Sequence, residues 1–170
     1  MTKSFDVVIV GGGLTGITAA TTLRDKGVTD ILLLEKESVI GGRVTTFHRE
    51  QARWDSGAQF FTVRSPLFQS AVASWLEQGW IKKWFGDRYP RYAGVAGMDQ
   101  LMKALARPLP IQLNAAVKRI EQTKQGWRCV LHTGESIASK AVLLTPPAPI
   151  SFQLLQKGNI PIDNALRTKI

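Results

Sequence analysis

Two near-continuous apolar runs open the chain, and a segment with helical spacing separates them. Residues 5–10 are rich in valine and isoleucine, which is typical of a strand buried on both faces of a sheet, and residues 30–35 repeat this character. Residues 11–16 break the first run, and 17–26 then have the pattern of a helix that ends at Gly27. This order predicts a βαβ unit with parallel strands and a right-handed crossover.

Two further helices are predicted in the middle of the chain. Ser65 and Pro66 suit the cap and the first position of a helix, and apolar residues then recur at helical spacing until Gly79. A glycine-marked turn at 94–97 precedes a short helix over 98–106. Residues 52–63 are predicted to form a loop with a short extended piece.

Short strands with turn signals between them follow the last of these helices. The strand patterns cover 111–123, 126–134 and 136–147, and residues 141–145 regain the buried character of the first runs before two prolines stop them. We therefore predict an α/β fold, a Rossmann-type dinucleotide-binding domain with a parallel sheet and an inserted antiparallel β-meander.

Composition excludes several classes of protein. The chain has 170 residues, 44% of them apolar and 21% charged, which suits a globular domain. It contains no apolar run of the roughly 20 residues that a membrane span needs, and its first residues lack a signal-peptide pattern. The single cysteine, Cys129, predicts no internal disulfide and suits a reducing compartment, so we expect a cytoplasmic protein.

The net charge of +9 does not by itself indicate nucleic-acid binding. The 22 Lys and Arg are spread along the chain, and no cluster with interleaved aromatic residues forms on one element. We expect a basic face that draws small anions toward a cleft, with no nucleic-acid and no membrane partner. His48 and His132 lie far apart in sequence and lack metal-ligand spacing, so no metal site is predicted.

The glycines after the first strand have the spacing of a dinucleotide-binding turn. Gly11, Gly13 and Gly16 form G-x-G-x-x-G between a predicted strand and a predicted helix, and Glu35 ends the second strand about 20 residues later. Such glycines permit a tight turn, close approach of a pyrophosphate and close packing of helix on strand. The carboxylate of Glu35 suits the two hydroxyls of a ribose and would repel a 2′-phosphate.

The turn alone does not distinguish NAD from FAD, but other segments do. "VVIVGGGLTG", "LLLEKESVIGGRVTT", "DSGAQFFTV", "YAGVAGMDQLMKAL", "VKRIE" and "AVLLTPPAP" are spread over most of the chain. Together they resemble the flavin-containing amine oxidase superfamily, and most closely its renalase-like branch. This resemblance implies FAD as the cofactor.

The resemblance also implies which residues bind FAD. Thr15 and Arg43 would contact the pyrophosphate, Gln59 and Phe60 would run along the flavin, and the backbone of Val117 would meet the adenine. The cofactor-binding set implied in this way comprises Gly11, Gly13, Leu14, Thr15, Gly16, Glu35, Lys36, Gly42, Arg43, Gln59, Phe60, Val117 and Thr145.

Ordinary structural roles remain open for several of these residues. Arg43 suits a surface salt bridge, Gln59 a hydrogen bond in a turn, and Val117 a place in the core. We expect one of the two phenylalanines, Phe60 or Phe61, to serve only the packing of the core. No residue is predicted to be catalytic.

The resemblance implies a domain division and an activity. Residues 1–62 and 93–150 would form the FAD-binding domain, and 63–92 and 151–170 would belong to a substrate domain that is largely absent from this chain. We therefore expect either the amino-terminal half of a longer protein or a natural truncation. The complete protein would transfer a hydride from a small amine or dihydronicotinamide-type donor to the flavin, with oxygen as acceptor. The alternatives are an NAD-binding dehydrogenase and a non-catalytic dinucleotide-binding fragment.

Overall fold

The computed structural model describes residues 3–163 and divides them into two compact units. The first unit contains residues 3–39 and 108–163, and the second is Ile40–Arg107. The predicted functional division, 1–62 with 93–150 against 63–92 with 151–170, follows other boundaries and stays a prediction. Its residues 1–2 and 164–170 lie outside the described residues.

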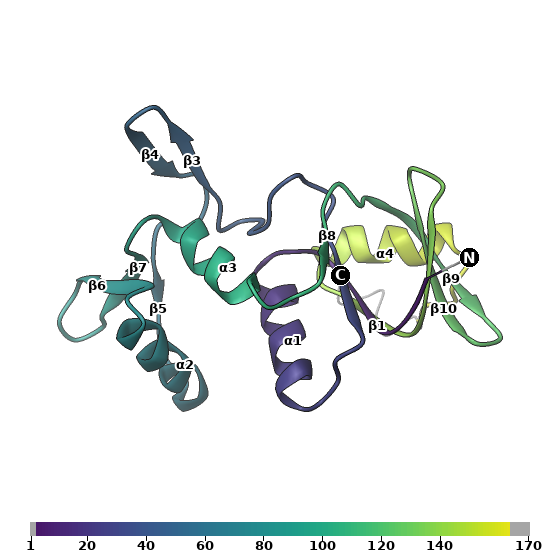
Figure 1. The fold of residues 1–170 in the computed structure, drawn as a ribbon, viewed down its shortest axis with the longest axis horizontal. Helices are drawn as coiled ribbons and strands as arrows, with labels where there is room; N and C mark the ends of the chain where they lie inside the picture. Colours follow the sequence, from purple (N-terminus) through teal and green to yellow (C-terminus); the bar gives the residue numbers. More distant parts are fainter. Residues whose placement is uncertain (1–2, 164–170) are drawn as a thin grey trace. The chain divides into compact units, whose positions relative to one another are not determined.

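The first unit is built on a six-stranded sheet in the order β8-β2-β1-β11-β10-β9 (Figure 1). The strand β1 (Ser4–Val10) pairs in parallel with β2 (Ile31–Leu34) and with β11 (Ser136–Leu144), and β2 pairs in parallel with β8 (Ile111–Gln112). The predicted parallel sheet of the α/β fold is therefore confirmed.

The predicted antiparallel meander occupies the other side of β11. It consists of β9 (Val117–Thr123), β10 (Gly126–Leu131) and the first residues of β11. The structure differs in one respect, because the predicted strand over 111–123 is divided between the parallel part and the meander. Asn114, at φ 54°, adopts the left-handed conformation between the two pieces and redirects the chain.

Two helices pack on this sheet. The helix α1 (Leu14–Asp25) contacts β1 and β2, and α4 (Ala148–Lys157) packs along β9 (Figure 1). Leu154 of α4 shares one apolar cluster with residues of β1, β2 and the meander, among them Val8, Val10, Leu32, Leu34, Ile120 and Ile137. By strand alternation, the buried Ile9 and Leu33 point to the opposite face. Both faces of the sheet's centre are therefore apolar and buried, as the sequence pattern predicted.

The helix α4 was not predicted. Pro146 and Pro147 end the strand, and Pro149 then lies in the first turn of α4, where its missing N–H costs no helical hydrogen bond. Gly158 follows the helix, and a Cβ at this position would lie 1.6 Å from the carbonyl oxygen of Ile120. Glycine therefore lets the end of α4 approach β9 closely.

The second unit combines a hairpin, a small sheet and two helices. The hairpin pairs β3 (Thr46–Arg49) with β4 (Ala52–Asp55), and the antiparallel sheet has the order β5-β7-β6, formed by Phe61–Thr62, Arg91–Gly94 and Ile81–Phe85. The helices are α2 (Pro66–Glu77) and α3 (Met98–Ala106).

Both helices of the second unit were predicted, and its small strands were not. The hydroxyl of Ser65 accepts the amide N–H of Phe68 at 3.3 Å, so the predicted N-cap of α2 is confirmed. The prediction missed β6 and most of β7, and it treated 94–97 as a turn although Gly94 is the last residue of β7. It gave 52–63 as a loop with one short extended piece, although two strands, β4 and β5, lie wholly within this segment.

Cys129 gives a direct test of the core. It lies in β10 with 0% of its surface exposed, and burial raises the pKa of its thiol to about 12. The thiol therefore stays protonated at about pH 8, and we expect no reaction with a thiol reagent in the native protein but full reaction in denaturant. In the unfolded chain the thiol has an ordinary pKa of about 8.5. The protonated, buried thiol therefore contributes fully to the stability of the fold below about pH 8.5, and this contribution is lost as the pH rises toward the pKa of the thiol in the folded protein. Rapid labelling of the native protein would contradict this placement.

Candidate functional site

The predicted glycine turn lies between β1 and α1. Gly11 has φ +107°, and the amide of Gly11 donates to the carbonyl oxygen of Leu34 at 2.8 Å. A Cβ on Gly16 would lie 1.9 Å from the carbonyl oxygen of Gly11, so only glycine lets the helix start this close to the turn. Gly13 is the N-cap of α1, and no side chain caps this end of the helix.

The uncapped start of α1 presents free amide groups. The first helical hydrogen bond of α1 runs from the amide of Ile17 to the carbonyl oxygen of Gly13, so the preceding amides have no partner inside the helix. Such amides, together with the positive end of the helix dipole, bind phosphate groups. The structure therefore places the predicted residues Gly13, Leu14, Thr15 and Gly16 together at one potential anion site.

The carboxylate of Glu35 is buried beside this turn. The side chain directly follows β2 and only 6% of the residue is exposed. One oxygen accepts the amide N–H of Gly12 at 2.6 Å, and the other accepts the amide N–H of Glu37 at 2.9 Å. Because an ionised carboxylate offers about four lone-pair positions, each oxygen of Glu35 retains capacity for one hydroxyl donor.

Thr145 joins the third strand end to the turn. Its hydroxyl donates to the carbonyl oxygens of Val10 at 2.8 Å and Gly11 at 3.1 Å, and its amide donates to Val10 at 3.0 Å. The carboxyl ends of β1, β2 and β11 therefore meet at one edge, where parallel α/β sheets bind their ligands.

Two further predicted residues lie near Glu35 in sequence or space. Val117 starts β9, and two residues before it the amide of Ala115 donates to the carbonyl oxygen of Glu35 at 2.8 Å. Val117 also packs against the apolar cluster, so its side chain has the core role that was left open. Lys36 is exposed and its ammonium pairs with Glu37 at 2.9 Å.

The remaining predicted residues lie in the second unit. The amide of Ala58 donates to the carbonyl oxygen of Arg43 at 2.9 Å, and a Cβ on Gly57 would lie 2.0 Å from that oxygen. The two motifs "GGR" and "DSGAQ" are therefore packed together by their backbones. The structure places Gly42, Arg43, Gln59 and Phe60 at exposed positions of this unit.

The two neighbouring phenylalanines have different surroundings. Phe61 is partly buried and packs against Phe68, Trp75 and Tyr92, with ring centroids 5.6–6.2 Å apart. Phe60 is 40% exposed and contacts the rings of Trp84 and Phe85. Phe61 is thus the one that serves core packing.

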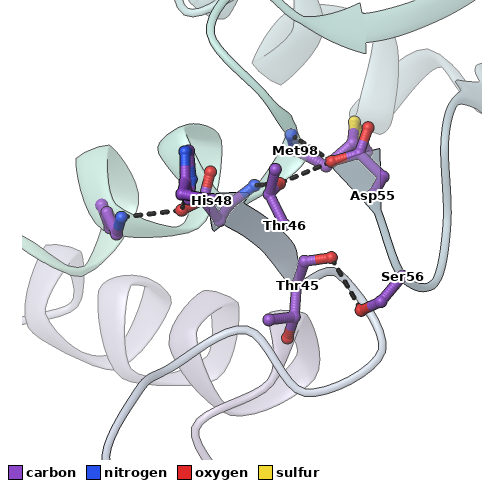
Figure 2. A network of polar contacts seen from close by, with 8 residues as sticks. Thr45, Thr46, His48, Asp55, Ser56 and Met98 are labelled. Atoms are coloured by element: carbon purple, nitrogen blue, oxygen red, sulfur yellow. Dashed lines mark hydrogen bonds and ion pairs between the residues drawn. The ribbon is translucent and has the colours of Figure 1, made fainter. Parts of the chain in front are cut away.

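A polar network in the second unit was not predicted (Figure 2). One oxygen of Asp55 accepts the hydroxyl of Thr46 and the amide N–H of Met98, and the Thr46 hydroxyl accepts the amide N–H of Asp99 at 3.0 Å. Asp99 is 5% exposed and also contacts His48 at 3.2 Å and Lys103 at 2.7 Å. The network ties the hairpin to the start of α3. The sequence signal that could have indicated this network is Asp99, an acidic residue in the first turn of a predicted helix.

The network has a testable pH dependence through Asp99. Burial alone would raise the pKa of Asp99, but the hydrogen bonds from Lys103 and His48, together with the charge of Lys103, outweigh burial and hold this pKa below its ordinary value. Asp99 therefore stabilises the fold above the ordinary carboxyl pKa, and this contribution is lost as the pH falls through the folded pKa. We expect Asp99→Asn to lower the free energy of unfolding by about 1–2 kcal/mol at neutral pH.

Denaturation curves of Asp99→Asn and the parent protein at several pH values test this. The difference between their free energies of unfolding is expected to shrink below about pH 4, where Asp99 becomes protonated first in the unfolded and then in the folded protein. Asp87→Asn is the matched control, because Asp87 is fully exposed and pairs only with Lys83 at 3.5 Å among the described residues. A difference that stays constant down to pH 2 would contradict an ionised Asp99.

A hollow on the second unit lies beside this network. It is lined by residues of the hairpin, the small sheet and the segment before α3, namely Thr46, Arg53, Trp54, Asp55, Gln59, Lys82, Trp84, Ala93, Gly94, Val95 and Gly97. Within residues 3–163, no three His, Cys, Asp or Glu gather as metal ligands, and no helix is long and apolar enough to cross a membrane.

Comparisons with known proteins give two matches to family profiles. The profile described as NAD(P)-binding Rossmann-like domain matches residues 9–75. The profile described as flavin containing amine oxidoreductase matches residues 71–161, which is more than half of the chain.

Curated relatives match parts of the chain. A chloroplastic protoporphyrinogen oxidase from Oryza sativa subsp. japonica is 35% identical over 111 residues, which cover 63% of this chain and 19% of that protein. A flavin-containing amine oxidase from Oncorhynchus mykiss is 39% identical over 52 residues, which cover 31% of this chain and 10% of that protein. The chain therefore matches less than a fifth of the length of these relatives.

Solved structures show the same fold. A double mutant of putrescine oxidase matches 99% of this chain and 63% of its own, with a TM-score of 0.76 and 16% identity. Wild-type putrescine oxidase bound to putrescine matches 91% of this chain and 60% of its own, with a TM-score of 0.72 and 16% identity. At this identity the likeness establishes the fold alone.

Proposed function

The chain belongs to the family of flavin-containing amine oxidoreductases, and on this premise we propose that it forms the FAD-binding part of an FAD-dependent oxidoreductase. FAD is the cofactor of this family. The observation that carries the proposal is the meeting of the glycine turn, the uncapped start of α1 and buried Glu35 at one edge of the sheet.

The residues at this edge fit the ADP part of FAD. The crowding at Gly11 and Gly16 leaves backbone rather than side chains at the turn, so a pyrophosphate has access to the amides of Gly13, Leu14, Thr15 and Gly16. The spare lone pairs of Glu35 suit two ribose hydroxyls. Thr145 acts as a positioning residue, because its hydroxyl fixes the two carbonyls on either side of the turn's start.

Other contacts to FAD are proposed on the family resemblance. The backbone near Val117 would meet the adenine, and its link to Glu35 through Ala115 supports this assignment. Arg43 would pair with phosphate oxygens through its guanidinium. Gln59 and Phe60 would run along the flavin ring, and Lys36 and Gly42 belong to the same implied cofactor-binding set.

The proposed reaction is a two-electron oxidation of a small donor. The donor gives up two electrons and two protons, and dioxygen takes them up as hydrogen peroxide. Bound FAD supplies the hydride acceptor for such a reaction, while the protein orients the donor and excludes water. The donor is either an amine or a dihydronicotinamide-type compound, the latter as in the renalase-like branch, and a cytoplasmic setting suits the single buried thiol of Cys129.

The test uses the intact protein. It is mixed anaerobically with an amine series and, separately, with dihydronicotinamide compounds, and the flavin absorbance is followed. We expect one class to bleach the flavin, and oxygen then to restore the colour with one peroxide formed per donor oxidised. A flavin that stays oxidised with both classes of donor would contradict the proposed oxidase activity. A colourless protein stabilised by NAD would instead support a dehydrogenase, and one stabilised only by ADP a non-catalytic fragment.

A further inference from the structure

The hollow on the second unit has two tryptophans in its lining. Trp54 and Trp84 are 49% and 53% exposed. Each is held by other aromatic rings, because Trp54 contacts Phe47 at 5.9 Å between centroids and Trp84 contacts Phe85 at 5.1 Å. Such supported, half-exposed indoles offer apolar surface on which a planar ring packs.

The charged side chains that line the hollow differ in how many hydrogen bonds they already make. Within residues 3–163, no hydrogen bond or ion pair engages the ammonium of Lys82, and Arg53 donates only to the carbonyl oxygen of Val95 at 3.2 Å. Asp55, by contrast, already accepts two hydrogen bonds at one carboxylate oxygen. The hollow therefore carries two positive groups without a counter-charge and one carboxylate that is committed to the fold.

We propose that this hollow binds the donor as a planar ring that carries an anionic group, a carboxylate or a phosphate. The ring packs against Trp54 and Trp84, and the anion lies at Lys82 and Arg53. The inference rests on the proposed function, because Gln59, which we assign to the flavin, lines the same hollow. It narrows the donor class, since a simple alkyl amine brings neither a ring nor a negative charge.

A cationic amine would meet unfavourable electrostatics here. Its charge would be repelled by Lys82 and Arg53, and Asp55 is the single carboxylate among the residues that line the hollow. The hydrogen bonds that Asp55 accepts from Thr46 and Met98 already offset part of its charge. The comparison of an anionic, a neutral and a cationic probe with the same ring therefore decides the question.

The experiment measures the binding of three naphthalene probes to the complete polypeptide by titration calorimetry. The probes are 2-naphthoate, 2-naphthylmethanol and 2-naphthylmethylamine. We expect 2-naphthoate to bind most tightly, and Lys82→Gln to weaken it about fivefold while leaving the neutral alcohol unchanged. Trp84→Leu is expected to weaken all three probes by about threefold to tenfold.

Lys83→Gln is the matched control. Lys83 neighbours Lys82 on β6 but does not line the hollow, and its ammonium pairs with Asp87. Because successive strand residues point to opposite faces, this variant is expected to bind 2-naphthoate like the parent. Tightest binding of the amine, equal binding of all three probes, or equal effects of the two lysine variants would each overturn the inference.

The absorbance spectrum of the same samples separates this inference from the proposed function. A yellow protein that prefers the amine would keep the flavin assignment and overturn the anion pocket. A colourless protein that prefers 2-naphthoate and responds to Lys82→Gln would keep the pocket and overturn the flavin assignment.

Discussion

Gly16→Ala is expected to abolish FAD binding and to lower the free energy of unfolding by about 3 kcal/mol. The new Cβ would lie 1.9 Å from the carbonyl oxygen of Gly11 and 3.1 Å from the hydroxyl of Thr145. Neither neighbour of this Cβ can move easily, because one is backbone and the other is a threonine held by hydrogen bonds. The helix α1 therefore has to move away from the turn. This movement separates the helix amides from the position at which the pyrophosphate would bind.

Gly27→Ala is the control for this substitution at the other end of the same helix. Gly27 has φ +88°, but nothing lies within 4 Å of a Cβ built there. We expect a cost of about 1–2 kcal/mol from the left-handed conformation, with FAD binding retained. Urea denaturation and the flavin content of the purified variants measure both effects. Normal flavin content in Gly16→Ala would contradict the role of the turn.

Glu35→Ala is expected to weaken FAD binding by about a hundredfold, because two charge-assisted hydrogen bonds to the ribose are lost together. The substitution also leaves the amides of Gly12 and Glu37 without their acceptor, and Gly12 is buried. We therefore expect an additional loss of about 2 kcal/mol in the free energy of unfolding.

The affinity is measured by titrating the apoprotein with FAD and following the flavin fluorescence. Glu37→Ala is the control, because the Glu37 side chain is 61% exposed and pairs with exposed Lys36. This control is expected to bind FAD like the parent. An unchanged affinity in Glu35→Ala would show that the ribose lies elsewhere.

Local rules were enough to predict the first strand, helix and strand. Their buried apolar runs and the glycine turn are dictated by neighbouring residues, and α3 was predicted with the bounds that it has in the structure, Met98–Ala106. The contact of Thr145 with Gly11 spans 134 residues, and only the folded sheet shows how it holds the turn.

The second unit was harder to predict because its strands are short and exposed. Only Thr46 is buried in β3, and none of the four residues of β4 is, so the hairpin lacks the alternation of a half-buried strand. The same strands carry Arg53 and Trp54 into the hollow, and Lys82 and Trp84 come from β6. The sequence offered no reason to group these four residues, since they come together only when the hairpin β3-β4 and the sheet β5-β7-β6 have formed.

The most direct test of the account is the identity of the ligand that leaves the purified complete polypeptide on denaturation. Mass spectrometry of the released material is predicted to find FAD, in an amount approaching one molecule per chain, and to find less in Glu35→Ala. Release of no nucleotide, or of a ligand without an adenine, would contradict a flavin dinucleotide at the glycine turn.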